Sequence, residues 1–273
     1  MSRDRSHMRS LRRFLVGLLG RLSRTLGSQR WTTGALRART LVFAPHPDDE
    51  VLGCGGTIVL KVRSGAPVQV AIMTDGRTSH ARLLSPQELV RIREEEAREC
   101  AARLGLPPQS YRFLGFEDHA LARHDAAARA QVRELIEQFR PEEIYVPHDR
   151  DLLSDHVATN TIVRSALAGY GHAVAVLEYP VWLWNTWPWT DGRDNGRMTG
   201  LQDIVALVFG CRAHIDVRSA ATVKAHALAA YRSQLERRDG NPDWPVLGDV
   251  SAGEFLARFA GDREIFRRSH YRP

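Results

Sequence analysis

Residues 41–57 have the sequence "LVFAPHPDDEVLGCGGT". The segment begins with a short apolar run, which predicts a buried strand over residues 40–44. A proline turn ends the run, and one histidine and three carboxylates follow within residues 46–50. Because loops held by a rigid scaffold often carry binding and catalytic residues, this polar loop is the first candidate for a functional site.

The rest of the chain alternates between strand-like and helix-like segments. We predict strands at residues 40–44, 68–74, 111–116, 142–148 and 173–180, and helices at residues 54–64, 86–104, 126–140 and 155–168. The helix at 86–104 has the clearest boundaries, since Ser85 and Pro86 stand at its start and Gly105 follows its end. After Trp182 the pattern weakens, and we expect one final helix at residues 219–237. This alternation predicts an α/β fold with βαβ units and a mostly parallel sheet.

The positive charge of the chain is concentrated at its N-terminus. Residues 1–30 contain eight arginines and one acidic residue, whereas the other 243 residues contain 30 basic and 31 acidic groups. The nearly neutral body argues against a groove that binds nucleic acid, so we expect no nucleic-acid partner. We divide the chain into a basic amphipathic leader, residues 1–34, and a folded domain, residues 35–273. The three cysteines have no paired spacing, which favours a cytoplasmic protein without disulfides.

Residues 9–26 predict a helix with one apolar face and flanking arginines. The apolar residues at helical spacing are Leu11, Phe14, Leu15, Leu18, Leu19, Leu22 and Leu26. The longest uninterrupted apolar run covers residues 14–20, and it is too short to span a bilayer, which needs about 20 residues. Two interpretations remain open. The helix either makes peripheral contact with the anionic inner membrane surface, or it packs on its own domain or on a second subunit.

Polar clusters follow the ends of four of the predicted strands, and in open α/β sheets ligands bind at the carboxyl ends of the strands. His46 and Asp49 are close enough in sequence to point at one ion, and His156, near the start of the helix after the fourth strand, is the third candidate ligand. Imidazole nitrogen and carboxylate oxygen suit Zn²⁺, and the same ligands also suit Fe²⁺. Asp48 is then free to take a proton from an attacking water. We interpret Asp155 as the N-cap of the helix that carries His156.

The glycines of "VLGCGGT" allow a second interpretation, a nucleotide-binding or methyltransferase loop. Such a loop follows its strand directly, whereas here five polar or turn residues stand between the strand and the glycines. We therefore expect Gly53, Gly55 and Gly56 to allow close backbone packing beside the polar loop.

Five segments occur in the order and at the separations typical of one family, the PIG-L/LmbE-like zinc-dependent de-N-acetylases, which this chain resembles from about residue 39 to its end. The segments are "APHPDDEVLGCGGT", "TDGRTSH", "RIREEEARECAARLGL", "YRFLGFEDHAL" and "DLLSDHVAT". The resemblance implies a Rossmann-like three-layer fold with a zinc site at the carboxyl ends of the strands, formed by His46, Asp49 and His156. It also implies hydrolysis of an N-acetyl group on an amino sugar of a glycoconjugate or lipid-linked precursor, with Asp48 as general base.

One position departs from the family pattern. The family's usual motif His-x-Asp-His has a second histidine that stabilises the oxyanion, and that position here is Leu153. Either another donor, such as His148 or Arg77, assists Asp48, or the activity is altered. The alternative function is therefore a catalytically impaired member that binds a sugar or a partner protein through the same cleft.

Two further features concern substrate binding. "EYPVWLWNTWPW" holds four of the six tryptophans, and indole rings suit stacking on a sugar. We expect Trp182 and Trp184 to contact the substrate. Arg93 resembles an arginine that the family uses near its substrate, although an ion pair with Glu96 along the helix is the other interpretation.

Overall fold

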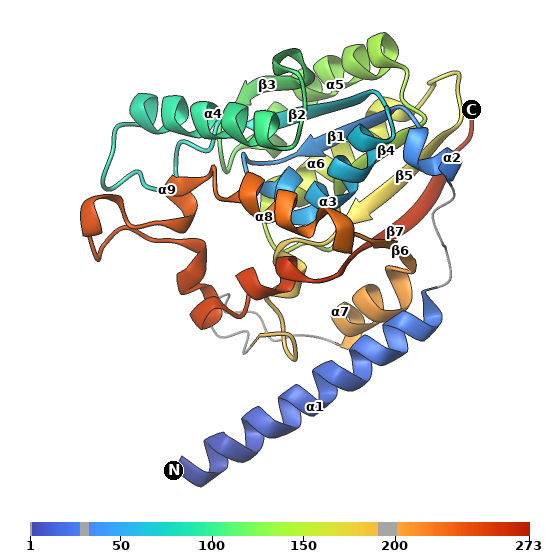
Figure 1. The fold of residues 1–273 in the computed structure, drawn as a ribbon. Coiled ribbons are helices and arrows are strands. Elements are labelled where there is room, and N and C mark those ends of the chain that lie inside the picture. The colour runs from blue at the N-terminus through green and yellow to red at the C-terminus, as the bar shows by residue number, and fades with distance from the viewer. Residues whose placement is uncertain (1, 28–32, 191–200) are drawn as a thin grey trace.

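The computed structural model describes residues 2–27, 33–190 and 201–273. A seven-stranded sheet with the strand order β3-β2-β1-β4-β5-β7-β6 forms its centre (Figure 1). The strands are β1 (Thr40–Ala44), β2 (Val68–Thr74), β3 (Tyr111–Phe116), β4 (Glu143–Pro147), β5 (Val174–Tyr179), β6 (Ala213–Asp216) and β7 (Arg263–Tyr271). Strands β1 to β5 pair in parallel, and β7 pairs antiparallel with both β5 and β6. The predicted α/β class with a mostly parallel sheet is confirmed.

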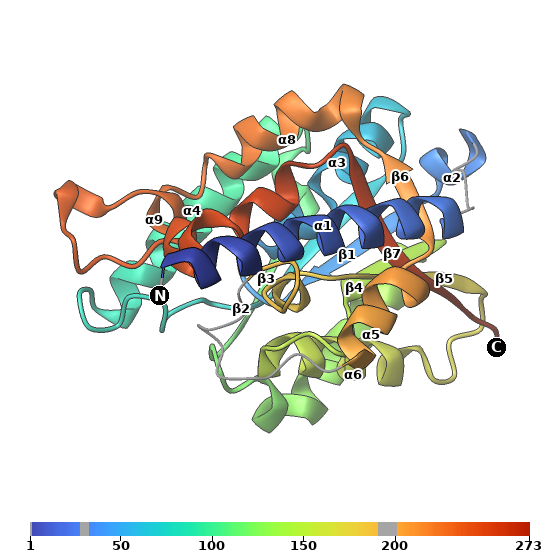
Figure 2. The same ribbon diagram turned by 90° about the horizontal axis from the view of Figure 1, so that it is seen from below.

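Helices cover both faces of the sheet (Figures 1 and 2). The helices α3 (Asp49–Arg63), α4 (Pro86–Arg103) and α8 (Ala221–Leu228) lie on one face, and α5 (Asp125–Phe139) and α6 (Ser154–Leu167) lie on the other. Alternate residues of β1 point to opposite faces of the sheet. Val42 packs in the apolar core on the side of α3, α4 and α8, whereas Leu41 and Phe43 pack in the core on the side of α5 and α6. This is the three-layer arrangement that the family resemblance implies.

The five parallel strands and α4 lie within one residue of their predicted positions, and Ser85 caps α4 by accepting a hydrogen bond from the backbone N–H of Glu88. The prediction for the first helix is wrong at its start. That helix begins at Asp49 rather than residue 54, because two helical pieces join across a kink at Cys54. Asp49 therefore lies in the first turn of α3, directly after the polar turn.

Two other predictions are corrected. Asp155 is not an N-cap, because Leu153 occupies that position and the Asp155 carboxylate accepts hydrogen bonds from distant backbone N–H groups instead. The final helix is broken into α8 and α9 (Arg232–Leu235). The antiparallel strands β6 and β7 were not predicted, since neither shows the long apolar run of a central strand.

The leader forms helix α1 (Ser2–Leu26), which lies beside α7 (Leu201–Val205) in both views (Figures 1 and 2). Val16, Leu19 and Leu22 pack against a small apolar cluster that includes the π-helical turn Ala206–Gly210. α1 therefore does pack on its own domain. No helix within the described residues is long and apolar enough to cross a bilayer. The division into residues 1–34 and 35–273 stays a prediction, as does membrane contact.

The glycines after the polar turn allow close packing, in agreement with the sequence-based interpretation. A Cβ atom on Gly53 would lie 2.2 Å from Cδ2 of Tyr179. A Cβ atom on Gly56 would lie 2.7 Å from Cβ of Val217, and the Gly56 N–H donates to the Glu264 carboxylate at 2.7 Å. These glycines face neighbouring elements of the fold, so no nucleotide-binding role is needed to explain them.

Gly53→Ala should lower the free energy of unfolding by about 1–3 kcal/mol, the usual cost of overpacking a core. The Tyr179 ring cannot easily move aside, because it is fully buried and its hydroxyl donates to the carbonyl oxygen of Phe43 at 2.7 Å. Urea denaturation measures the change. Gly171→Ala is the control, since no heavy atom lies within 4 Å of its added Cβ. Equal stability of the two variants would contradict the packing argument.

Candidate metal centre

Three predicted ligands meet at the carboxyl edge of the sheet. The Asp49 Oδ2 atom lies 3.1 Å from Nδ1 of His46 and 3.2 Å from Nε2 of His156. One donor atom from each residue lies within 4.8 Å of the others. His46 comes from the turn after β1, Asp49 from the first turn of α3, and His156 from the first turn of α6. The fold therefore brings together residues that are separated by more than one hundred positions in the sequence.

The second nitrogen of each imidazole faces a buried carboxylate. Nε2 of His46 lies 3.1 Å from Oδ1 of Asp118, and Nδ1 of His156 is hydrogen-bonded to Oδ2 of Asp151 at 3.2 Å. In metal sites, a ligating histidine usually donates its other N–H to such a carboxylate, which fixes its tautomer and orientation. Asp118 and Asp151 were not predicted to have this role, although both lie in the polar clusters that follow strands.

The electrostatics of the centre also fit a divalent cation. Burial lowers the pKa of His156, but the Asp49 and Asp151 carboxylates outweigh it and raise that pKa to about 9. Burial raises the pKa of Asp49, but the charge of His156 outweighs it and holds that pKa well below its usual range. The pocket thus stabilises positive charge. Nε2 of His156 is buried, faces Asp49 and has no hydrogen-bond partner among the described residues, as expected of a metal ligand.

Two other groups could hold a cation by distance alone. One of them is His46, Asp118 and Asp155. Asp155 already accepts two backbone hydrogen bonds, and this group contains one imidazole instead of two. His148, Asp149 and Glu178 form the other. Glu178 is paired with Arg164 and Arg267, which identifies that group as an ion-pair network. The set with two imidazoles fits Zn²⁺ best.

Asp48 lies beside the ligands, and its carboxylate is not one of the three candidate metal ligands. Burial raises its pKa to about 7, against the opposing effect of the nearby Arg93 guanidinium. The backbone of Asp48 has φ 120°, which is rare outside glycine, and its N–H donates to Oε2 of Glu50 at 3.1 Å. Strained backbone of this kind persists only where the surroundings hold it. The carboxyl is therefore held in place with a pKa near that of a working general base.

Glu50 is a third residue whose role the sequence did not reveal. It is fully buried, and its Oε1 atom accepts hydrogen bonds from the hydroxyls of Tyr111, at 3.1 Å, and Tyr231, at 2.5 Å. Burial raises the pKa of Glu50, and these donors partly oppose it. Its other oxygen holds the backbone of Asp48. The third acid of the polar loop, Glu50, thus positions the first, Asp48.

A cavity of about 280 Å³ opens beside this centre. Of the predicted site residues, the cavity is lined by His46, Asp48, Asp49, Arg93 and Trp182. Leu153 also lines it, while His156 lies buried behind Asp49. Arg77, His148 and Trp184 are not among the lining residues. Arg77 pairs with Asp75, His148 is fully buried beside Asp149, and Trp184 packs on Trp189.

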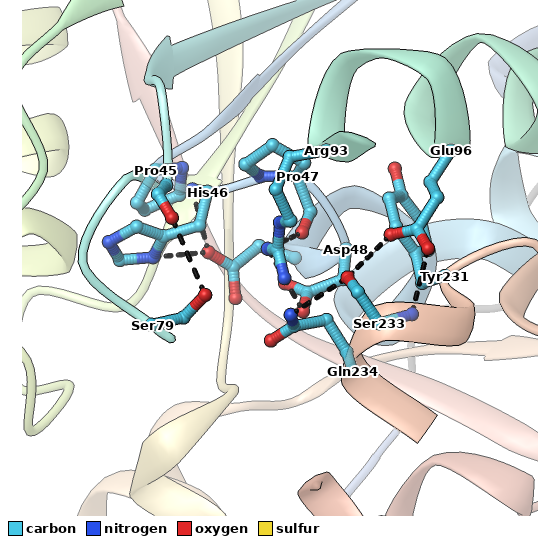
Figure 3. Close-up of polar contacts among 12 residues, drawn as sticks. Pro45, His46, Pro47, Asp48, Ser79, Arg93, Glu96, Tyr231, Ser233 and Gln234 are labelled. Carbon is cyan, nitrogen blue, oxygen red and sulfur yellow. Dashed lines mark hydrogen bonds and ion pairs between the residues drawn. The ribbon is translucent and has the colours of Figure 1, made fainter. Parts of the chain in front are cut away.

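Arg93 is buried against the polar turn rather than paired along its helix. Figure 3 shows its guanidinium beside Pro47 and Asp48, and Nη2 donates to the Pro47 carbonyl and lies 3.4 Å from Oδ2 of Asp48. Glu96 instead accepts hydrogen bonds from the N–H and the hydroxyl of Ser233 at 2.7 Å. The Nε and Nη1 atoms of Arg93 are buried without a hydrogen-bond partner among the described residues. Arg93 therefore has two donors available at the wall of the cavity.

This chain is similar to known proteins in both sequence and fold. The PIG-L family model, described as GlcNAc-PI de-N-acetylase, matches residues 41–167. The "Probable N-acetyl-alpha-D-glucosaminyl L-malate deacetylase 2" of Bacillus cereus is 32% identical over 139 residues, which cover 49% of this chain and 62% of that protein. The 2'-N-acetylparomamine deacetylase of Streptomyces fradiae is 37% identical over 97 residues, which cover 33% of this chain and 32% of that protein. The matches thus span less than two thirds of either relative.

A solved structure shares the fold over most of its length. N,N'-diacetylchitobiose deacetylase from Pyrococcus horikoshii aligns with a TM-score of 0.64, at 21% identity, over 91% of this chain and 90% of that one. The fold and the site define an α/β protein with a histidine–aspartate centre at the carboxyl edge of a parallel sheet. Residues 41–167, which carry that centre, match the PIG-L family model. The resemblance stated from the sequence is confirmed.

Asp118→Asn should lower the affinity for Zn²⁺ by about 10–100-fold, the usual effect of removing such a partner of a ligating histidine. Oδ2 of Asp118 accepts from the N–H and hydroxyl of Thr78, so an amide that keeps those bonds would turn its NH₂ group toward His46. His46 would then favour the wrong tautomer. Isothermal titration of the metal-free protein with Zn²⁺ measures this affinity.

The control is Asp239→Asn, because the Asp239 side chain is 94% exposed. His46→Ala and His156→Ala should each remove Zn²⁺ binding altogether while the far-ultraviolet circular dichroism stays unchanged. Full Zn²⁺ occupancy in either alanine variant would rule out this centre.

Proposed function

We propose that this protein is a zinc-dependent N-deacetylase that removes an acetyl group from an amino sugar. The observation that carries the proposal is the carboxylate of Asp48, which lines the cavity beside a group of two histidines and an aspartate that fits a zinc ion. The family of residues 41–167 and the names of the relatives, all deacetylases of amino sugars, support the same reaction.

His46, Asp49 and His156 would hold the metal. A divalent cation bound there supplies a Lewis acid that polarises the acetyl carbonyl. Asp48 takes a proton from the attacking water as the water oxygen bonds to the carbonyl carbon, and it delivers that proton to the nitrogen when the C–N bond breaks. Acetic acid, which then ionises to acetate by releasing its proton to solvent, and the free amine leave. Zn²⁺ is the metal that the ligand set favours, and Fe²⁺ is the alternative that the same ligands accept.

The walls of the cavity suit a sugar. Trp182 lines it and stacks on Phe255 with ring centroids 4.6 Å apart, so the indole is held as a flat apolar wall. The two unpartnered donors of Arg93 can bind hydroxyl or phosphate oxygens. We propose an N-acetylated amino sugar of a glycoconjugate or a lipid-linked precursor as the substrate.

Leu153 supports a second candidate, a protein that binds the same sugar without hydrolysing it. Leu153 lines the cavity at the position where the family pattern has a histidine, and its side chain offers no hydrogen-bond donor. Turnover separates the two candidates. The purified, Zn²⁺-loaded protein should release acetate from at least one member of a panel of N-acetylglucosamine derivatives. Saturable binding of a panel member without acetate release would favour the binding protein.

Asp48→Asn should lower kcat about 10²–10⁴-fold, because an amide cannot accept the proton of the attacking water. Metal content and binding of the deacetylated product should stay close to those of the wild-type protein, since the substitution keeps the shape of the side chain. Acetate release and metal analysis are measured on the same preparation. Unchanged kcat would exclude Asp48 as the general base.

We further propose that α1 holds the protein at the cytoplasmic surface of the inner membrane. Leu11, Phe14 and Leu18 lie one helical turn apart and are 58%, 68% and 50% exposed. Other apolar residues of α1, Val16, Leu19 and Leu22, pack on the body, so the body uses only part of the apolar surface. Arg13 and Arg21 are exposed on the same helix. An apolar strip flanked by arginines is complementary to an anionic lipid surface.

Replacing Leu11, Phe14 and Leu18 together by serine should abolish co-sedimentation with vesicles that contain phosphatidylserine. Those residues do not support the body, so the thermal midpoint should change little. Val157→Ser is the control, since Val157 is an exposed apolar residue on the distant helix α6. Salt should weaken binding, because each arginine near the surface contributes about 1 kcal/mol that ionic strength screens. If the wild-type protein does not co-sediment with anionic vesicles, the membrane proposal is wrong and α1 serves only to pack on the body.

A further inference from the structure

The cavity contains a histidine to which the sequence-based predictions gave no role. His119 lies in the turn between β3 and the short helical turn Leu121–His124, and it lines the cavity together with Leu153. We propose that the His119 side chain donates the hydrogen bond that stabilises the oxyanion, the role that Leu153 cannot fill. This inference rests on the proposed deacetylase function.

The ring of His119 is well placed and not otherwise engaged. Its centroid lies 6.5 Å from the centroid of the His46 ring, close enough for one acetyl group to contact both residues. Within the part of the chain that the structure describes, the His119 ring has no hydrogen-bond partner, and the residue is exposed at the cavity wall. An imidazole carries an N–H donor in both of its protonation states, so the role does not depend on its charge.

The backbone around His119 is held in an unusual conformation. His119 has φ 60°, in the left-handed region that few residues other than glycine adopt. The Asp155 carboxylate fixes this turn by accepting the His119 N–H at 2.7 Å and the Leu121 N–H at 3.3 Å. Asp155 stands two positions after Leu153 in the chain. The segment that lacks the expected histidine therefore anchors the turn that brings another histidine to the cavity.

Arg93 also has two unpartnered donors at the cavity wall, and these are the ones assigned above to hydroxyl or phosphate oxygens of the substrate. The nitrogens of His80 are hydrogen-bonded to the Ser79 hydroxyl and the Pro245 carbonyl, and its ring stacks on Trp244. The side-chain amide of Gln234 donates to the Ser233 hydroxyl. Among the lining residues of the described chain, His119 is thus the one imidazole besides the metal ligand His46.

The chemical role follows from the charge that develops during hydrolysis. When the water oxygen bonds to the acetyl carbon, the C=O π electrons move onto the carbonyl oxygen, which becomes an anion. A donor aimed at that oxygen stabilises the transition state more than the substrate, so its loss lowers kcat more than it changes KM. His119 transfers no proton in this scheme, because Asp48 carries the proton from the water to the leaving nitrogen.

The test measures acetate release on a substrate that the wild-type protein hydrolyses. His119→Gly removes the ring and relieves the left-handed backbone, so folding should be preserved. We expect kcat to fall about 10²–10³-fold, with Zn²⁺ content unchanged and a much smaller change in KM. The double variant His119→Gly, Leu153→His should have a kcat at least about tenfold higher than that of His119→Gly, because residue 153 also lines the cavity and its new imidazole supplies an N–H donor there. His172→Gly, an exposed histidine far from the cavity in sequence, is the matched control.

Three results would overturn the inference. The first is a kcat for His119→Gly equal to that of His172→Gly. The second is a fall in kcat that only follows a loss of Zn²⁺, which would assign His119 to the support of the metal centre. The third is a double variant no more active than His119→Gly. A wild-type protein that binds the sugars but releases no acetate would overturn the deacetylase proposal itself, and this inference with it.

Discussion

Five buried aspartates, Asp48, Asp49, Asp118, Asp151 and Asp155, impose the main physical constraint on this structure. Removing an ionised carboxylate from water costs several kcal/mol unless a counter-charge or hydrogen-bond donors compensate. The two imidazoles and Arg93 supply positive charge, and backbone N–H groups supply further donors. These partners come from different strand ends and from helix α4, so the carboxylates are stable only when the parallel sheet and its helices are correctly assembled. A cation bound between them would reduce the remaining repulsion.

The surrounding structure keeps this charged cluster in one arrangement. Glu50 accepts hydrogen bonds from two tyrosines that belong to β3 and to the segment before α9, and its other oxygen fixes the Asp48 backbone. Farther along α3, the Glu264 carboxylate of β7 accepts the N–H groups of Gly56 and Thr57 and pairs with Lys224 of α8. Elements that differ most from a simple βαβ pattern thus secure the helix that carries Asp49. Buried polar networks of this kind are stabilising only when every member is satisfied.

The positions of the metal ligands in this cavity are more tightly constrained than the position of the hydrogen-bond donor for the substrate. The metal ligands are tied to each other by geometry, so none can be replaced without losing the centre. The hydrogen-bond donor for the substrate is constrained only by its position in space, and either a helix start or a nearby turn can provide it. Leu153 and His119, which line one cavity from different elements, illustrate that freedom. Helix α1 shows another division of roles, since part of its apolar surface packs on the body and part faces solvent.

The sequence alone determined the parallel strands and helix α4, because hydrophobic periodicity is a local signal. It also predicted the convergence of His46, Asp49 and His156, because ligands of open α/β sheets bind at the carboxyl ends of the strands. It also indicated that the glycines serve packing. Only the tertiary structure decided that Asp118 and Asp151 lie against the histidines, that Glu50 holds Asp48, and that His119 rather than His148 or Arg77 reaches the cavity. It alone showed that Asp155 anchors a distant turn instead of capping its helix, and that β7 joins the sheet antiparallel. Each of these depends on contacts between residues far apart in the chain, and neither local propensity nor spacing encodes the direction in which a side chain finally points.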